Sequence, residues 1–253
     1  MKTKIFPENM IPLGDKKFNF HCHSGLSCFT QCCKNVDMYL FPYDIIRLKH
    51  AVGLDSEVFL REHTFLKKGA NPYFPSLMLK LTEGERRACP FLNQNGCAVY
   101  SDRPSSCRTY PLERAVDRDT SRKRHKEYYF LTDHSYCLGH GEEVQFTVQK
   151  WIRNQNVDTY NCMNDLWAEI ESIFLTNPWK GEEIGGPKQQ LAFMICFNID
   201  GFRRYVAAHK ILGLYSLTRD QKNTIGKDDA ELLKFGFEWL KIVLTGKSNL
   251  VLK

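Results

Sequence analysis

The chain has 253 residues, of which 43% are hydrophobic and 25% charged, a composition that excludes a disordered or low-complexity protein. The formal net charge of +6 is small for this length and gives no reason to predict specific nucleic-acid binding. No stretch approaches the roughly 20 apolar residues of a membrane-spanning helix, and no secretory signal follows the first lysines, so we expect a cytoplasmic protein without a membrane anchor.

Ten cysteines are the most informative feature of the composition. Disulfides are rare in a reducing cytosol, where clustered cysteines are more often metal ligands or catalytic thiols. The first cluster is HCHSGLSCFTQCC, residues 21–33. Cys28 and Cys32 are four residues apart, so a helical turn would place both thiols on one face, as a shared metal centre requires. Cys33 would need a bent backbone or a polynuclear cluster, and Cys22 would close a loop back to the same centre.

The next segments predict two helices and a strand. PYDIIRLKHAVG predicts a helix from Pro42 to about Gly53, since proline suits the first turn and glycine ends a helix. DSEVFLREHTFLKKG predicts a second helix over residues 55–69, capped by Asp55 or Ser56. PSLMLKL, residues 75–81, alternates enough to predict a short strand.

A hairpin is predicted where CPFLNQNGCAVY turns at Asn95 and Gly96. At roughly 3.3 Å per residue, this hairpin would leave Cys89 and Cys97 about 15 Å apart, too far for one mononuclear site. Either this segment is a loop instead of a regular ladder, or the protein has two centres.

Beyond the hairpin, SDRPSSCRTYP predicts one helical turn or a loop, and it carries Cys107. LERAV (residues 112–116) and EYYFLTD (residues 127–133) predict two more strands. Cys137 follows in a loop.

From about residue 145, helical periodicity replaces the cysteines. TYNCMNDLWAEIESIF places five large side chains on one helix face: Tyr160, Met163, Trp167, Ile170 and Phe174. Residues 189–212 predict two helices that meet near Gly201, and residues 228–244 predict a helix capped by Asp228. Cys162 and Cys196 lie in these apolar helices, where we expect them to be core residues.

These elements predict an α+β fold. A small cysteine-rich metal-binding region with short hairpins, residues 1–144, is expected to pack against a mainly helical region, residues 145–253. The apolar helix faces need a partner and no long linker separates the regions, so we expect one compact unit.

Eight cysteines are candidate metal ligands, too many for one cluster and enough for two: Cys22, Cys28, Cys32, Cys33, Cys89, Cys97, Cys107 and Cys137. We expect the main centre to use Cys28, Cys32, Cys33 and Cys107, with Cys97 next. Cys22, Cys89, Cys97 and Cys137 would then remain for a second centre.

Four polar side chains beside the cysteines have more than one possible role. His21 and His23 could bind zinc or iron, or could lie at the surface around the centre. Arg103 and Arg108 flank Cys107, where they could offset thiolate charge, bind the carboxylate of a cofactor or substrate, or simply face solvent. No catalytic residue is identified.

Three segments in fixed order resemble the YkgJ-type cysteine-cluster family over roughly residues 20–140: CHSGLSCFTQCC, PYDIIRL and CPFLNQNGCAVYSDRPSSCRTYPL. The resemblance implies zinc or iron chelation. The family usually has two residues between successive cysteines, whereas here five separate Cys22 from Cys28 and three separate Cys28 from Cys32.

The sequence is also similar to the flagellin lysine N-methylases. This resemblance implies one or two [4Fe–4S] clusters, and S-adenosylmethionine as the donor in methyl transfer to a protein lysine. The Cys-x₃-Cys-x₂-Cys signature of radical-SAM enzymes is not matched, and no glycine-rich nucleotide loop is present. Methyl transfer is therefore implied by resemblance alone.

Three functions fit these features. One is an iron–sulfur protein with enzymatic or electron-transfer work, which would act on a protein substrate. The others are a structural zinc protein that binds a partner, and a metal chelator or carrier. The oligomeric state is not predicted by the sequence.

Overall fold

The computed structural model describes residues 11–85, 87–118, 125–179, 181–182 and 185–253. Within these ranges the strands form antiparallel pairs: β1 (Phe18–Asn19) with β8 (Gln145–Phe146), β2 (Thr64–Lys67) with β3 (Ser76–Leu79), β4 (Leu92–Asn93) with β5 (Gly96–Cys97), and β6 (Leu112–Asp117) with β7 (Lys126–Leu131). These small sheets, together with the helices, confirm the predicted α+β class.

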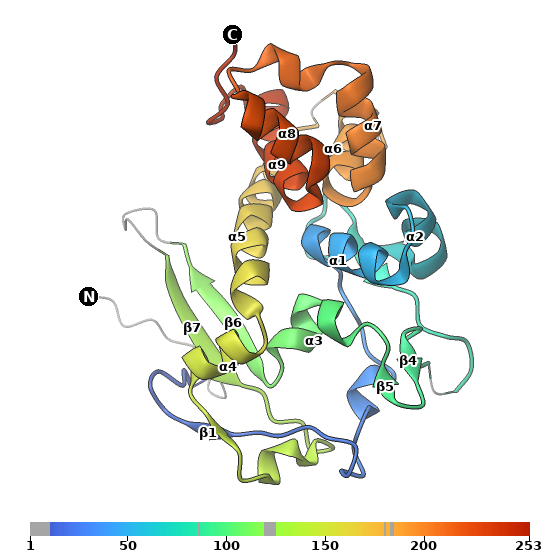
Figure 1. The fold of residues 1–253 in the computed structure, drawn as a ribbon, viewed down its shortest axis with the longest axis vertical. Helices are drawn as coiled ribbons and strands as arrows, with labels where there is room; N and C mark the ends of the chain where they lie inside the picture. The colour runs from blue at the N-terminus through green and yellow to red at the C-terminus, as the bar shows by residue number, and fades with distance from the viewer. Residues whose placement is uncertain (1–10, 86, 119–124, 180, 183–184) are drawn as a thin grey trace.

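The α-helices of the described residues are α1 (Pro42–Val52), α2 (Ser56–His63), α3 (Ser105–Thr109), α4 (Val148–Asn154), α5 (Val157–Phe174), α6 (Pro187–Phe197), α7 (Ile199–Ala208), α8 (Arg219–Lys227) and α9 (Asp229–Thr245). Short 3₁₀ helices are η1 (Gln31–Cys33), η2 (Tyr100–Asp102), η3 (Leu138–Gly141) and η4 (Ile211–Leu214). Helices α6 to α9 gather at one end, and α5 runs from them towards the β6–β7 hairpin (Figure 1). None of the described helices combines the length and the apolar character that a membrane crossing requires.

Helix α1 has the ends that its sequence predicts. Pro42 is its first residue, the Asp44 carboxylate accepts the Phe41 amide at 3.0 Å, and Gly53 ends the helix at φ 68°. A positive φ of this size favours glycine, because it has no Cβ to clash with the backbone.

The second predicted helix ends earlier than its sequence indicated. Helix α2 stops at His63, and Thr64–Lys67 form strand β2 instead of a further helical turn. The strand pairs with β3, where Thr64 faces Leu79 and Lys67 faces Ser76. The prediction of helix over residues 64–69 was wrong because pairing with β3 outweighs local helix propensity.

The main hydrophobic core is built by both predicted regions. Ile45 and Leu48 of α1 and Phe59 of α2 are fully buried in one cluster with Ile170 of α5 and Leu240 of α9. Helix α1 therefore lies within the helical bundle. The proposed boundary at residue 144 remains a prediction.

Gly236 lets α9 approach α6 and α7 closely. A Cβ atom at this position would lie 2.7 Å from the Ile195 side chain and 2.8 Å from the Phe202 ring. Real Cβ atoms do not approach that closely, so the packing of α9 here requires glycine.

A second, smaller core anchors the start of the cysteine run. Phe18 and Phe20 pack with Leu112, Trp151 and Val157, which come from β6, α4 and α5. The Phe20 amide also donates to the Val144 carbonyl at 2.9 Å. This core therefore fixes the position of the chain at Phe20, where the cysteine run begins.

Candidate metal centre

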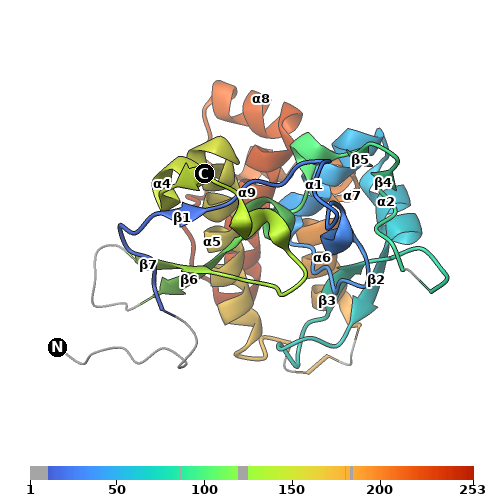
Figure 2. The same ribbon diagram turned by 90° about the horizontal axis from the view of Figure 1, so that it is seen from below.

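Four segments that carry cysteines meet at one end of the molecule. They are the chain between β1 and α1, the β4–β5 hairpin, helix α3, and the segment between β7 and η3 (Figures 1 and 2). The predicted ligands are separated by more than 100 residues, from Cys22 to Cys137, and the fold brings them together.

The predicted helical turn at Cys28 and Cys32 is absent. Thr30 between them has φ 65°, in the left-handed region, and this interrupts any right-handed helix. Cys28 lies in a turn in which the Gln31 amide donates to its carbonyl at 2.9 Å, and Cys32 and Cys33 follow in η1. The expectation that Cys28 and Cys32 share one helix face was therefore wrong.

Cys32 and Cys33 have adjacent thiols. Their hydrogen bond is the largest influence on both groups: it lowers the pKa of Cys32 to about 7 and raises the pKa of Cys33 above its usual range. A thiol with a pKa near 7 is about half ionised at neutral pH, and the thiolate is the form that binds metal.

Cys33 and Cys89 are joined through the backbone. The Cys89 amide donates to the Cys33 carbonyl at 2.7 Å, next to an isolated bridge between Lys34 and Ala88. The β4–β5 segment is thereby fastened to η1.

Cys89 and Cys97 lie closer together than a regular hairpin would place them. The ladder has two residue pairs, and the Leu92 amide donates to the Cys89 carbonyl at 3.0 Å, so the chain turns before the first strand. Burial raises the pKa of the Cys89 thiol, and the charge of Cys97 raises it further. The predicted separation of about 15 Å assumed an extended chain from Cys89 onwards, which is wrong.

Cys107 is positioned by a buried carboxylate. Asp44 is fully buried in α1, and its second oxygen accepts the Ser105 amide at the start of α3 at 2.8 Å. Burial raises the pKa of Asp44 to about 6, against these hydrogen bonds. The Cys107 thiol on α3 is exposed and lies 4.0 Å from the Met38 sulfur. The surrounding protein and then the Cys89 thiol raise its pKa.

The last cysteine segment meets the first. The Leu138 amide donates to the Cys28 sulfur at 3.2 Å, which places Cys28 beside Cys137. Reduced solvation raises the pKa of Cys22 to about 11, with further contributions from Cys32, Cys137 and Cys28.

The thiols thus form two groups that meet at Cys32. The first thiol group is Cys22, Cys28 and Cys137, and the second thiol group is Cys33, Cys89, Cys97 and Cys107. Cys32 affects the pKa of members of both groups. Among the described residues, the potential ligand atoms of His21, His23 and Glu142 form a group in which all lie within 4.8 Å of one another.

Tyr110 is a neighbour of the centre that sequence reasoning missed. Its hydroxyl is buried without a hydrogen-bond partner of ordinary geometry in the described parts of the chain. Burial and the Cys137 thiol raise its pKa. A metal-bound thiolate at Cys137 would accept a hydrogen bond from this hydroxyl, as ligands commonly do from their outer partners. The tyrosine in RTYP, close after Cys107, was the available signal.

Arg103 and Arg108 are buried and bind protein oxygens. Arg103 donates to the Tyr100 carbonyl at 2.5 Å and to the Gln155 side chain, and Arg108 donates to the carbonyls of Gln155 at 2.5 Å and Ser101 at 2.6 Å. They join the loop before α3 to the end of α4. Burial raises the pKa of Cys97, and the Arg103 charge partly offsets this, so its charge acts on one candidate ligand. Their predicted role in cofactor binding remains a prediction.

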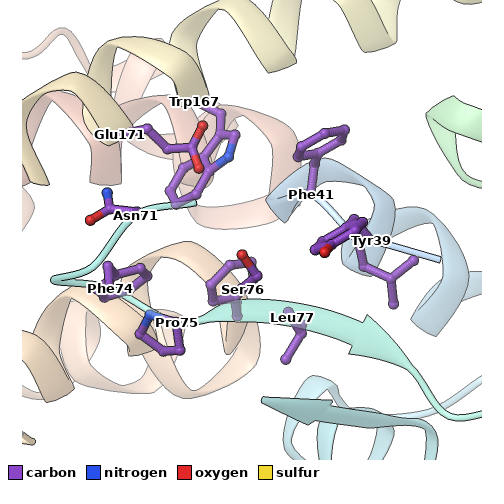
Figure 3. Close-up of a pocket in the computed structure, with 11 residues that line it drawn as sticks. Tyr39, Phe41, Asn71, Phe74, Pro75, Ser76, Leu77, Trp167 and Glu171 are labelled. Atoms are coloured by element: carbon purple, nitrogen blue, oxygen red, sulfur yellow. The ribbon is translucent and has the colours of Figure 1, made fainter. Parts of the chain in front are cut away.

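A small aromatic cavity lies away from the thiols, between β3 and α5 (Figure 3). Its lining includes Tyr39, Phe41, Trp167 and Glu171, and it encloses about 30 Å³. This is the share of one water molecule in liquid water and far below the size of a typical ligand pocket. It is therefore too small for a cofactor such as S-adenosylmethionine.

A known protein family matches the segment that carries the clustered cysteines. Residues 21–138 match the model of the CxxCxxCC family, which is described as a "Putative zinc- or iron-chelating domain". This segment, just under half of the chain, is similar to the CxxCxxCC family. The match confirms the resemblance to YkgJ-type proteins, while the relation to flagellin lysine N-methylases remains a prediction. No curated protein and no solved structure matches the chain.

The CxxCxxCC match spans all eight candidate ligands. Together with the cysteine content, the family description supports metal binding as the function of this segment.

Proposed function

We propose that the eight cysteines bind two [4Fe–4S] clusters. The observation that carries the proposal is the convergence of eight thiols from four segments, with Cys32 acting on members of both thiol groups. Eight thiols are twice the number that one zinc ion or one [4Fe–4S] cluster binds. Four thiolates on one zinc ion, at about 2.3 Å each, would be about 3.8 Å apart. A cluster of several irons accepts sulfur ligands over a wider area.

The two thiol groups suggest the ligand sets. Cys32 would complete the first thiol group, giving Cys22, Cys28, Cys32 and Cys137. The second thiol group already has four members, Cys33, Cys89, Cys97 and Cys107. This assignment differs from the set expected from the sequence, which combined Cys28, Cys32, Cys33 and Cys107.

Side chains beside each of the two thiol groups would stabilise an anionic cluster there. The Arg103 charge favours the thiolate of Cys97. The buried Tyr110 hydroxyl would donate to the Cys137 sulfur. Such groups offset the negative charge that thiolate ligands bring to a cluster.

Methyl transfer to a protein lysine from S-adenosylmethionine remains a prediction from resemblance. Electron transfer needs fewer assumptions, because it requires the clusters and a partner protein. A loss of colour on reduction that reverses on reoxidation would support it.

Anaerobic purification with iron, sulfide and zinc analysis tests the proposal. The wild-type protein should contain about eight irons and eight sulfides, the content of two [4Fe–4S] clusters. Cys137→Ala and Cys107→Ala should each lose about half of both, and Cys162→Ala is the matched control that should lose none. Zinc without sulfide would overturn the proposal in favour of a structural zinc protein. Complete loss of iron in both variants would overturn the division into two clusters.

Metal removal adds a second readout to the same experiment. The proposed ligands come from four segments, so stripping the metal with a chelator should lower the melting temperature. An unchanged melting curve together with an unchanged near-ultraviolet circular dichroism spectrum would contradict a metal centre that holds these segments.

A further inference from the structure

A second cluster of metal-ligating side chains lies beside the thiols. His23 Nε2 lies 3.3 Å from the Oε2 atom of Glu142, and His21 Nδ1 lies 4.0 Å from the same oxygen. All three ligand atoms lie within 4.8 Å of one another. Glu142 follows η3, so two distant parts of the chain supply this cluster.

The backbone fixes the two histidines relative to Glu142. The amide of His21 donates to the Gly139 carbonyl at 3.0 Å, and the amide of Phe20 donates to the Val144 carbonyl at 2.9 Å. The segment 139–144 is thereby held along the start of the cysteine run. Phe20 is itself buried in the smaller core, so the site rests on a fixed support.

The two histidines lie at Glu142, whereas Cys22 between them is associated with the thiols. Successive side chains of an extended segment lie on opposite sides, an arrangement that would place residues 21 and 23 together and Cys22 apart from them. The histidine ring centroids are 4.8 Å apart, as expected for neighbours on one side. The charges that act on Cys22 come from Cys32, Cys137 and Cys28, which places its thiol in the first thiol group.

The distances match those of metal ligands. Nitrogen and oxygen ligands at about 2.0–2.2 Å from a tetrahedral zinc are about 3.4 Å apart. The distance between His23 and Glu142 already has this value, and that between His21 and Glu142 would have to shorten by roughly 0.6 Å on the same estimate. The two histidine nitrogens, which lie within 4.8 Å of each other, would have to approach by up to roughly 1.4 Å. The side chains are 50%, 38% and 33% exposed, so the small movement that this requires is open to them.

We propose that His21, His23 and Glu142 form a separate site for a divalent transition metal, of which zinc is the best fit. Two imidazoles and one carboxylate are ligands that zinc prefers, and three protein ligands leave one position open to water or to another molecule. The site does not depend on the iron–sulfur proposal, because it uses none of the eight thiols.

The hydrogen bond from the Gly25 amide to His23 indicates that a metal bound at this site would be released readily to solution. The Gly25 amide donates to His23 Nδ1 at 3.2 Å, so in the neutral ring the proton lies on Nε2 and faces Glu142. A metal at Nε2 takes the place of that proton and moves it to Nδ1, where the Gly25 amide loses its acceptor. Binding thus costs one hydrogen bond, and together with the open position this favours a site that releases its metal.

Zinc titration of the anaerobically purified, metal-loaded protein tests the site. Wild-type protein should bind one zinc equivalent beyond the metal it already holds. His23→Ala and Glu142→Gln should weaken this binding by more than the roughly 10–100-fold that changes around a metal ligand typically cost. His209→Ala, which removes an exposed histidine at the end of α7, should bind as the wild type does.

Iron and sulfide are counted in the same samples, which separates this proposal from the preceding one. Unchanged iron and sulfide in His23→Ala and Glu142→Gln, with the extra zinc lost, supports a separate site. Equal zinc binding in all variants would overturn it. Loss of the resident metal in both variants would also overturn it, because these residues would then serve the thiolate centre. Cobalt provides a second probe: a visible spectrum without a thiolate-to-cobalt band is expected.

Discussion

Two cysteines outside the thiol groups show how well the burial of a single residue can be predicted from sequence. Cys196 is 2% exposed in α6, as predicted, and burial raises its pKa well above the usual value. Cys162 is exposed on α5, so its prediction as a core residue was wrong. The correct signal was present, because Cys162 follows Tyr160 by two residues, about 200° around the helix from the buried face.

This difference predicts opposite behaviour in two serine variants. Cys196→Ser places an unpaired hydroxyl in the core and should lower the free energy of unfolding by about 1–3 kcal/mol. Cys162→Ser should change it by no more than about 0.5 kcal/mol. Denaturant unfolding measures both.

The metal content of both serine variants should equal that of the wild type. In the folded wild-type protein, a thiol reagent should modify Cys162 and leave Cys196 unreacted until unfolding. Rapid modification of Cys196, or loss of metal from either variant, would contradict this assignment.

At the scale of elements, Asp44 connects two helices. Its two oxygens accept the Phe41 amide before α1 and the Ser105 amide at the start of α3, so one side chain sets both helix starts. Asp44→Ala would leave one buried and one partly buried amide without acceptors. The free energy of unfolding should fall by about 3 kcal/mol, measured by denaturant unfolding.

Asp37→Ala is the matched control for Asp44. The Asp37 side chain is 68% exposed and pairs with the exposed Lys67, so its loss should cost less than about 1 kcal/mol. Because α3 carries Cys107, iron bound by the second thiol group should also decrease in Asp44→Ala alone. Equal stability and equal iron in the two variants would show that Asp44 does not hold α3.

The elements that sequence could predict are those whose signal is local. Helix α9 begins after Asp228, whose carboxylate accepts the Glu231 amide at 2.9 Å, and the buried face of α5 is the one predicted. Helix α8 was missed, although its Thr218 and Gln221 form a capping box. It was missed because its residues are mostly polar, whereas α5 and α9 were predicted from their apolar periodicity.

The candidate site was predictable in its residue types and not in its geometry. Clustered cysteines identify ligands without a fold, but their grouping depends on the Thr30 conformation and on the backbone bond from Cys89 to Cys33. Glu142 was missed because its partners His21 and His23 lie about 120 residues away. Such pairings arise from tertiary structure, which a local pattern does not contain.

At the scale of the whole molecule, a buried charge cluster joins the two predicted regions. Lys49 of α1 is 5% exposed, and its ammonium lies 2.9 Å from Asp200 of α7 and 2.9 Å from Asp229 of α9. Arg203 and His50 also face Asp229, at 2.5 and 2.8 Å. Burial alone would raise the pKa of Asp229, but hydrogen bonds from Lys49 and Arg203 outweigh it and lower the pKa.

The lowered pKa of Asp229 predicts a loss of stability in acid. The folded state favours the ionised carboxylate more than the unfolded state does, so its contribution is complete above the unfolded pKa of about 4 and is lost below it. Asp229→Asn should therefore show a smaller fall in melting temperature than wild type between pH 5 and pH 3. Acid also releases metal from thiolates, so the difference between the two proteins is the quantity to compare. Parallel curves would contradict the prediction.

The shared core has a consequence for how the protein is made. The eight candidate ligands, up to Cys137, leave the ribosome well before α9, which is needed to cover α1 and complete the core. During this interval the nascent thiols are present without the packed structure that later surrounds them. We therefore expect that metal loading follows release of the chain, and that oxidation of the exposed thiols before loading limits the yield of metal-loaded protein.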